Sequence, residues 1–431
     1  MKRLILIFIP VLFIWSCKKD TTDTKPPVIS ILSPYANQLY NVNDTILISA
    51  NVTDETQLTS VYVSLENAQL SQVEPAVNIH VTSRNMGFSQ RYELSDQHLL
   101  SGIYYVVVTA NDGYNLISGF QKISITASPR KRTGIYVLTQ PYNPDINVLK
   151  IDSNFQVSQQ FSTISDYSGS AINSYYQQLT IAGSYTGHLN AFNLSTNSSQ
   201  WSHPSGSGST PYFEGIYNDD TLSYVPLYNG QIKGYDNNGM QNFSAAADPN
   251  FYGTQLFKQN GKLFVEEKYI TGSPINLVTF YCPFGANYQE ALMPCDAVAI
   301  CPKDYNDLLI FGNNASGQGV MEMFTINSNT FYSPQTLPSG KILSAVAIDS
   351  DDWLIGCDNN TVYKYQYSNN SLTSFIPSIR AYHLLYDDVN NQIIVASKNT
   401  VSEYTYVTIP TLVNTVNTTD SIINIHLLFN K

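Results

Sequence analysis

Short segments of alternating apolar and polar residues begin after Pro26-Pro27 and recur almost to the end of the chain. Alternation with a period of two is typical of half-buried β-strands, and the Asn, Asp, Gly and Ser residues between the segments favour turns. The first seven strands are expected near residues 28–32, 46–53, 59–66, 77–83, 88–94, 102–111 and 119–126. Seven short strands in about a hundred residues predict a β-sandwich over residues 27–127.

Three stretches of this segment, residues 26–34, 52–61 and 102–115, resemble bacterial immunoglobulin-like modules. Residues 27–127 contain neither Cys nor Trp, so the antibody-type disulfide and its packing Trp are absent. The resemblance therefore implies a scaffold module. Because the chain enters and leaves such a sandwich at opposite ends, we expect a spacer that lifts the following domain off a membrane.

A loose repeat of about 40 to 45 residues follows a hinge at residues 128–133. In each copy an apolar strand follows a polar turn, and a second strand ends on an aromatic residue. The apolar strands begin at Tyr136, Gln178, Thr221, Lys262, Asp307, Asp352 and Gln392. Seven copies predict an all-β, seven-bladed β-propeller over residues 133–431. A jelly roll or an open β-solenoid is the alternative.

The last strand of the chain indicates how the propeller closes. Residues 423–429 resemble residues 380–386, the strand that opens the last repeat, but no repeat follows them. We therefore expect 422–429 to supply the innermost strand of the first blade, whose other strands come from about 134–164. Closure of this kind removes exposed strand edges.

Two repeats, residues 181–201 and 228–239, resemble those of the quinoprotein-like (PQQ/YVTN-type) propellers. Members of that group include quinone-dependent dehydrogenases and a lipoprotein that assists outer-membrane protein assembly. The dehydrogenases typically hold the quinone against a disulfide between adjacent cysteines. Because no two cysteines of this chain are adjacent, a quinone cofactor is not expected.

The N-terminus has the layout of an export signal. Lys2 and Arg3 precede an apolar run at residues 4–15, which is too short to span a membrane. Residues 14–17 resemble the lipobox of bacterial lipoproteins. The resemblance implies a signal peptide over residues 1–16 and acylation of Cys17, with palmitate among the chains. Residues 17–26 would form a flexible tether, and the alternative is an uncleaved helix with an unmodified Cys17.

This signal predicts an exported outer-membrane lipoprotein whose partner is the membrane, through its lipid anchor. Whether it faces the cell surface or the periplasm is left open. Only 13% of residues are charged, and the net charge of -11 contains no long run of either sign apart from residues 130–132. Nucleic acid is not expected as a partner, because phosphate binding needs clustered cations. A monomer is expected.

Acidic residues supply the first candidate sites. Asp54, Glu55 and Asp112 end strands whose loops lie at one end of the sandwich, where their carboxylates could hold calcium. No other cofactor is expected. The alternative is that these acids only stabilise turns locally.

In the propeller, acids recur at equivalent turns, and Asp304, Asp349 and Asp387 are taken as binding residues of an acidic mouth. Turn stabilisation is again the alternative. His383 and His426 occupy equivalent innermost strands and are expected to be neighbours beside the central channel. Because the six histidines are scattered singly, no zinc site is expected.

Four cysteines are left after Cys17, namely Cys282, Cys295, Cys301 and Cys357. In an oxidising compartment they permit two disulfides by any of three pairings. The alternative is that some are free thiols that pack as small hydrophobic residues.

No nucleophile elbow, P-loop or HExxH zinc motif occurs, so no catalytic residue is predicted. The leading hypothesis is a non-enzymatic, lipid-anchored envelope protein whose propeller binds a protein or a glycan. One alternative is a polysaccharide lyase or hydrolase with its site in the propeller mouth. A further alternative is an outer-membrane assembly factor.

Overall fold

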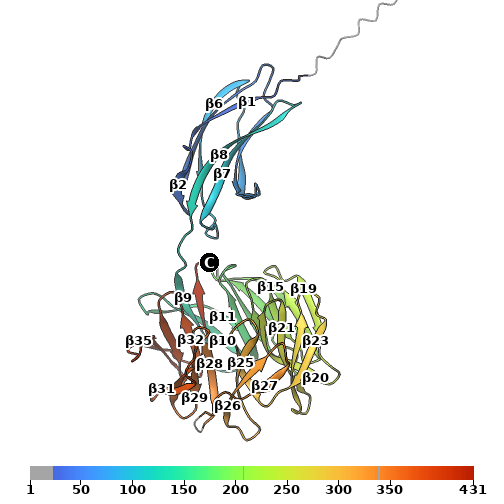
Figure 1. Ribbon diagram of the computed structural model, residues 1–431, viewed down its shortest axis with the longest axis vertical. Helices are drawn as coiled ribbons and strands as arrows, with labels where there is room; N and C mark the ends of the chain where they lie inside the picture. Colours follow the sequence, from blue (N-terminus) through green and yellow to red (C-terminus); the bar gives the residue numbers. More distant parts are fainter. Residues whose placement is uncertain (1–22, 207, 338–339) are drawn as a thin grey trace, which may run out of the picture. The chain divides into compact units, whose positions relative to one another are not determined.

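The computed structural model describes residues 23–431 apart from 207 and 338–339. All regular elements in this part of the chain are strands (Figure 1), as predicted. The chain divides into two compact units, Met1–Pro129 and Arg130–Lys431. No helix within the described part is long and apolar enough to cross a membrane. The predicted signal peptide and Cys17 lie outside the described residues.

The first unit is a sandwich of two sheets, as the alternation predicts. A three-stranded sheet has the order β1 (Val28–Ser33), β3 (Thr45–Thr53), β6 (Asn85–Glu93). A five-stranded sheet has the order β2 (Gln38–Asn41), β8 (Leu116–Thr126), β7 (Gly102–Asn111), β4 (Ser60–Asn67), β5 (Gln72–Ile79). Inward residues such as Ile46, Ile48, Val63 and Val108 are fully buried between them. The short strand β2, which pairs parallel to β8, was not predicted.

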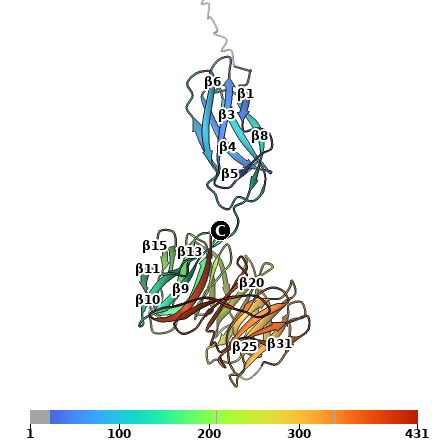
Figure 2. The same cartoon turned by 90° about the vertical axis from the view of Figure 1, so that its left-hand side faces the viewer.

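The second unit contains seven four-stranded antiparallel sheets over residues 130–431 as far as they are described (Figure 2). Sheet 1 holds β11 (Val157–Ile164), β10 (Asp145–Ile151), β9 (Arg132–Gln140) and β36 (Ser421–Phe429); sheet 2 holds β12 (Tyr167–Asn173), β13 (Gln178–Gly183), β14 (Leu189–Asn193) and β15 (Ser198–His203); sheet 3 holds β16 (Tyr217–Asn218), β17 (Ser223–Pro226), β18 (Gln231–Tyr235) and β19 (Gln241–Ala246).

The other four sheets follow the same meander. Sheet 4 holds β20 (Phe251–Gln259), β21 (Lys262–Tyr269), β22 (Ile275–Tyr281) and β23 (Asn287–Leu292); sheet 5 holds β24 (Asp296–Pro302), β25 (Asp307–Asn313), β26 (Gly319–Thr325) and β27 (Thr330–Tyr332); sheet 6 holds β28 (Ile342–Ala347), β29 (Asp352–Cys357), β30 (Thr361–Gln366) and β31 (Ser371–Pro377); sheet 7 holds β32 (His383–Asp387), β33 (Gln392–Ala396), β34 (Thr400–Thr405) and β35 (Leu412–Asn417).

The C-terminal strand joins the first sheet, as its resemblance to β32 predicts. β36 pairs antiparallel with β9, with Ile425 opposite Val137 and Leu427 opposite Ile135. It also contacts β12 of sheet 2 and β32 of sheet 7, so it takes the innermost position of sheet 1. Strands β12, β16, β20, β24, β28 and β32 contact one another in that order around the remaining sheets.

The hydrophobic core of the propeller lies between the sheets. Each pair of consecutive sheets shares one cluster of buried apolar side chains, and a further cluster joins sheet 7 to sheet 1. In that last cluster Ile394 and Val401 of sheet 7 pack with Ile135 and Val137 of sheet 1 and with Ile425 of β36. The two ends of the unit are therefore held together by apolar packing as well as by strand pairing.

Candidate functional site

A cleft of about 680 Å³ opens in the propeller where sheets 1, 2 and 3 adjoin. Its walls are the turn after β12, the turn after β16, the end of β36 and the start of the propeller chain. The cleft is lined by Arg130, Ile172, Asn173, Ser174, Tyr175, Tyr176, Asn218, Asp219, Asp220, Thr221, Leu427, Phe429 and Lys431. A volume of this size is typical of sites for small ligands.

Local hydrogen bonds hold the aromatic wall of the cleft in place. The Tyr176 amide donates to Asn173 Oδ1 at 3.1 Å, and the rings of Tyr175 and Tyr176 meet edge to face at 4.9 Å. The Phe429 amide donates to Ser174 Oγ at 3.1 Å, which ties the turn to the end of β36. Three aromatic rings are thereby fixed around one cavity.

The turn after β16 contributes two acids to the lining of the cleft. Asp219 Oδ1 accepts the amides of Thr221 and Leu222, each at 2.7 Å, and Oδ2 pairs with Lys258. Burial raises the pKa of Asp219, but the hydrogen bonds from Lys258 and the backbone outweigh it, so the net pKa is lowered. Asp219 is therefore ionised at neutral pH. The neighbouring Asp220 is exposed and offers carboxylate oxygens to a ligand.

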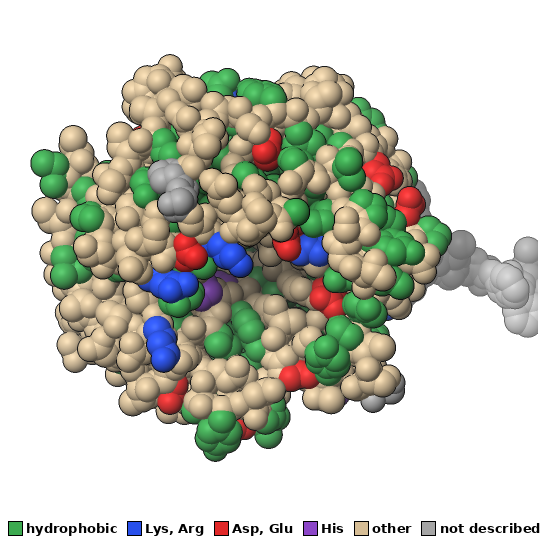
Figure 3. All heavy atoms as spheres, turned by 90° about the horizontal axis from the view of Figure 1, so that it is seen from below, with side chains coloured by type: hydrophobic (Ala, Val, Ile, Leu, Met, Phe, Trp, Pro, Cys, Tyr) green, Lys and Arg blue, Asp and Glu red, His purple; other side chains and the backbone are tan. Residues whose placement is uncertain are grey.

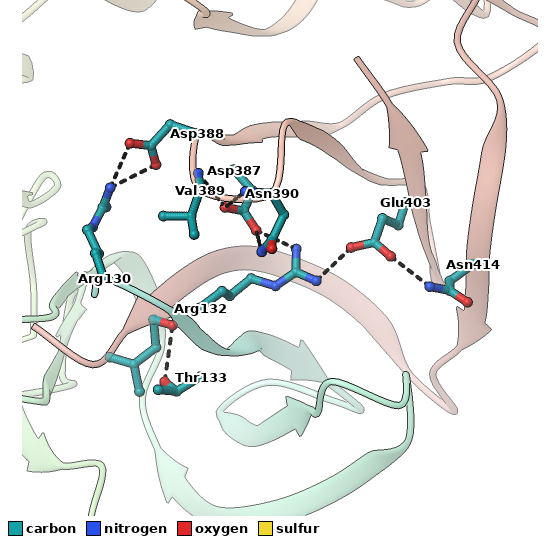
Figure 4. A network of polar contacts seen from close by, with 10 residues as sticks. Arg130, Arg132, Thr133, Asp387, Asp388, Val389, Asn390, Glu403 and Asn414 are labelled. Carbon is teal, nitrogen blue, oxygen red and sulfur yellow. Dashed lines mark hydrogen bonds and ion pairs between the residues drawn. The ribbon is translucent and has the colours of Figure 1, made fainter. Parts of the chain in front are cut away.

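Arg130 and Arg132 join the start of the propeller chain to sheet 7 (Figure 4). Arg132 Nη1 lies 2.8 Å from Asp387 Oδ2, and Arg132 Nη2 lies 2.7 Å from Glu403 Oε1. The side chains of Asp387 and Glu403 are 0% and 2% exposed, so this is a buried ion network. Arg130 pairs with the exposed Asp388 at 2.7 Å. From residue 130 onward, the predicted hinge is thus part of the propeller.

The predicted binding acids Asp304, Asp349 and Asp387 stabilise turns in the structure. In each of them Oδ1 accepts the backbone amides two and three residues later, at 2.7–3.2 Å. Asp387 is also engaged by Arg132, and Asp304 Oδ2 lies 2.7 Å from Lys303 Nζ. This geometry is the one expected if the acids stabilise turns locally. None of these three acids lines the cleft.

His383 begins β32 and His426 lies within β36, two innermost strands that contact each other. His426 Nε2 lies 2.8 Å from Ser170 Oγ, which in turn lies 2.8 Å from the Tyr167 hydroxyl. Burial lowers the pKa of His383 to about 4, and burial together with the charge of His383 lowers the pKa of His426 to about 3. Both imidazoles are therefore neutral at neutral pH.

In the first unit, Asp54 and Asp112 come together with Asp23 of the predicted tether, and ligand atoms of the three carboxylates lie within 4.8 Å of one another. Glu55 does not join them, because it forms an ion pair with Lys25 at 2.8 Å. Asp54 and Asp112 also accept backbone amides of their own turns. Calcium binding stays a prediction, which a calcium-dependent rise in the melting temperature of this unit would test.

The structure does not confirm the predicted disulfides. Cys282, Cys295, Cys301 and Cys357 are all free thiols. Cys301 and Cys357 share the cluster between sheets 5 and 6, while Cys295 and Cys282 pack in two other inter-sheet clusters. Burial raises the pKa of Cys295, Cys301 and Cys357 to about 12, so these thiols are uncharged. They pack as small apolar residues, as in the free-thiol alternative.

A group of ionisable residues that the sequence analysis missed lies on sheets 3 to 5. It includes Glu214, before β16, and Lys268, near the end of β21. Lys268 Nζ lies 2.6 Å from Asp296 Oδ1 and 3.6 Å from Glu266 Oε2. These residues are separated by more than fifty positions from Glu214 and follow no motif, so no spacing in the sequence could have grouped them.

Residues 27–95 match the family of the bacterial Ig domain. This part of the first unit is therefore similar to a bacterial Ig domain. The match agrees with the resemblance found in the sequence and with the two-sheet sandwich of the structure. A search among curated proteins found no match.

Solved structures similar to the chain include propellers of low sequence identity. A quinoprotein alcohol dehydrogenase-like protein from Bacteroides thetaiotaomicron is 13% identical, with 94% of this chain and 99% of that chain covered and a TM-score of 0.46. The WD40 β-propeller domain of Doa1 is 11% identical, with 62% and 86% covered and a TM-score of 0.47. A chain of the mitotic checkpoint complex is 12% identical, with 57% and 78% covered and a TM-score of 0.48.

Proposed function

We propose that this chain is an exported, lipid-anchored binding protein whose propeller holds a glycan in the cleft between sheets 1, 2 and 3. The observation that carries the proposal is the cleft itself, which is lined by Tyr175, Tyr176 and Phe429 together with the acids of the turn after β16. An Ig domain joined to a propeller suits a binding or scaffold role. No catalytic step is part of the proposal.

The chemistry of the cleft favours a glycan over an apolar ligand. Sugar rings have an apolar face that packs on aromatic side chains and an edge of hydroxyl groups that need hydrogen-bond partners. The exposed Asp220 supplies acceptors, and Arg130 supplies donors on the same cavity. Arg130 is itself held 3.6 Å above the centre of the Phe429 ring, so its position is fixed before a ligand arrives.

Ligand binding tests the proposed site. A Tyr176→Ala variant is expected to bind the recognised glycan about tenfold more weakly than the unaltered protein, because it loses one aromatic face of the cleft. Binding to a panel of envelope and host glycans, followed by calorimetry on the positive ones, measures this.

The matched control is Tyr142→Ala, since Tyr142 is 70% exposed and lines no part of the cleft. Equal losses in both variants, or capture of proteins but of no glycan, would contradict the glycan proposal. Release of shortened chains from a bound glycan would identify the hydrolase or lyase of the alternative hypothesis.

The lipid anchor is proposed from residues 2–17 alone. A Cys17→Ser variant is expected to lose essentially all incorporation of labelled palmitate and to shift from the membrane fraction to the soluble fraction, since two or more acyl chains are needed for stable attachment. A Ser16→Ala variant, which keeps a small residue before Cys17, is the control and should be labelled normally. Labelled palmitate in the Cys17→Ser protein would contradict the proposal.

A further inference from the structure

Two cationic residues, Arg130 and Lys431, lie opposite each other at the cleft. They follow from the antiparallel pairing of β36 with β9, which continues one step past the ends of the two strands. There the Asn430 amide donates to the carbonyl of Lys131 at 3.0 Å, and the Lys131 amide donates to Asn430 Oδ1 at 2.8 Å. Because the pairing is antiparallel, the next opposed pair is Lys431 and Arg130.

The cleft lies on the face of this strand pair to which both cations belong. Side chains alternate between two faces along a strand, and every second residue at the end of β36, namely Leu427, Phe429 and Lys431, lines the cleft. Arg130 lines it as well, with its guanidinium carbon 3.6 Å from the centre of the Phe429 ring. Lys131, the next residue, lines no part of it. Two cations from neighbouring segments therefore share one wall of the cleft.

The positive charge of this pair is only partly compensated. Within the described residues, the side chain of Lys431 forms no ion pair and no hydrogen bond. Arg130 donates from Nη1 to the two carboxylate oxygens of the exposed Asp388, at 2.8 and 2.7 Å, while its Nε and Nη2 make no such bond to the described part of the chain. Like charges directly opposite each other on paired strands repel, and an anion bound between them removes the repulsion.

The acids of the cleft belong to a different sheet. Asp219 is paired with Lys258 and accepts two amides of its own turn, so its charge is already compensated. Asp220 is exposed and follows β16 of sheet 3, whereas the two cations extend the strands of sheet 1. One ligand can therefore direct an anionic group to sheet 1 and hydroxyl groups to sheet 3.

The opposite end of the propeller shows no such separation of charge. Because Lys431 lines the cleft, the cleft lies at the end of the propeller where Figure 1 marks the C-terminus. Figure 3 shows the other end, where acidic and basic side chains are mixed around a central hollow. Selectivity for an anionic ligand is thus a property to expect of the cleft.

We propose that the cleft selects glycans that carry a carboxylate, which Arg130 and Lys431 bind between them. This inference rests on the proposed function and adds the class of sugar to it. A carboxylate accepts charge-assisted hydrogen bonds from the guanidinium fork and from an ammonium group at the same time. Tyr175 and Tyr176 line the same cleft and suit the apolar face of the sugar ring. Uronic acids and sialic acids share this chemistry.

Calorimetry on the full chain with two matched pairs of probes tests the proposal. The pairs are methyl glucuronide with methyl glucoside, and sialyllactose with lactose. We expect the acidic member of at least one pair to bind about tenfold more tightly than its neutral partner, and the difference to shrink at high salt. Preference within the first pair identifies a uronic acid, and preference within the second identifies a sialic acid. Binding of sulfated glucose without binding of either carboxylated probe would overturn the assignment of a carboxylate.

Variants of two neighbouring lysines separate the site from a general effect of charge. Lys431→Gln is expected to lower the ratio of acidic to neutral affinity about fivefold, and Lys431→Arg should retain the ratio because it keeps the cation. Lys131→Gln removes the same charge from the other face of the strand pair and is the matched control, with an unchanged ratio. Equal effects of Lys431→Gln and Lys131→Gln would overturn the proposal.

Failure of this inference is distinguishable from failure of the proposed function. Equal binding of acidic and neutral sugars by the unaltered protein, with both weakened in Tyr176→Ala, would overturn the selectivity and leave glycan binding in the cleft standing. Binding of no sugar, either among these probes or in the wider glycan panel, would overturn both proposals.

Discussion

Replacing Arg132 with methionine is expected to lower the free energy of unfolding of the propeller by about 3–5 kcal/mol. Methionine keeps much of the apolar stem of the arginine, but it leaves the carboxylates of Asp387 and Glu403 buried without their shared cation. Chemical denaturation followed by tryptophan fluorescence measures the loss. The signal reports on the propeller, because Trp201 and Trp353 both lie there and Trp15 belongs to the predicted signal peptide.

The control for this prediction is Arg130→Met, two residues earlier. The ion pair of Arg130 with Asp388 is exposed, with side chains 42% and 58% accessible, and exposed pairs contribute only about 0–1 kcal/mol. Its contact with the Phe429 ring adds about 0.5–1 kcal/mol. An Arg132→Met variant that is no less stable than Arg130→Met would show that the buried network does not stabilise the closure of the propeller.

The two arginines also show what the sequence could not reveal. A short basic run behind Pro129 reads as a linker, and the sequence analysis placed the hinge there. The partners of these arginines lie more than 250 positions away, at Asp388 and Glu403, and become neighbours only because sheet 7 closes against sheet 1. Local composition holds no information about such pairs.

The architecture itself was largely predictable because it rests on periodic signals. Alternation predicted most strands of the sandwich, but it missed β2 and placed at 77–83 the strand that the structure has at β5 (Gln72–Ile79). The spacing of polar turns predicted the sheets of the propeller. Turn acids such as Asp349 were found by that spacing, and their hydrogen bonds show that turn formation is the reason for it. Because this local role accounts for the acids in the turns of sheets 3, 5, 6 and 7, their recurrence does not by itself indicate a binding site.

The cleft could be predicted only in part. Tyr175 and Tyr176 of its aromatic wall are neighbours in the sequence, but the other walls of the cleft come from segments about 40 and 250 residues further along. Glu214 could not be recognised from the sequence, because isolated glutamates are common in polar loops. What distinguishes Glu214 is its burial and a carboxylate oxygen that has no hydrogen-bond partner among the described residues, and both are properties of the folded chain.

Removal of β36 by ending the chain at Asp420 is expected to prevent the propeller from folding. Ile425, Leu428 and Phe429 are each at most 6% exposed, and burial of such side chains contributes about 1.5–3 kcal/mol apiece. Their sum is comparable with the about 5–15 kcal/mol that stabilises a typical domain. The truncation would also uncover the edge of β9, which favours association between copies. Gel filtration and the loss of a cooperative thermal transition would report both effects.

A peptide of residues 421–431 added in trans provides the decisive comparison. Because β36 contributes a whole strand to sheet 1, the peptide is expected to pair with β9 and restore a monomeric, cooperatively melting propeller. The same peptide with Ile425→Asp should fail, since Ile425 is 1% exposed and a carboxylate at that position would be buried without a partner. A truncated chain that melts like the full-length protein, with or without the peptide, would mean that sheets 7 and 1 hold together through the packing of Ile394 and Val401 on Ile135 and Val137 alone.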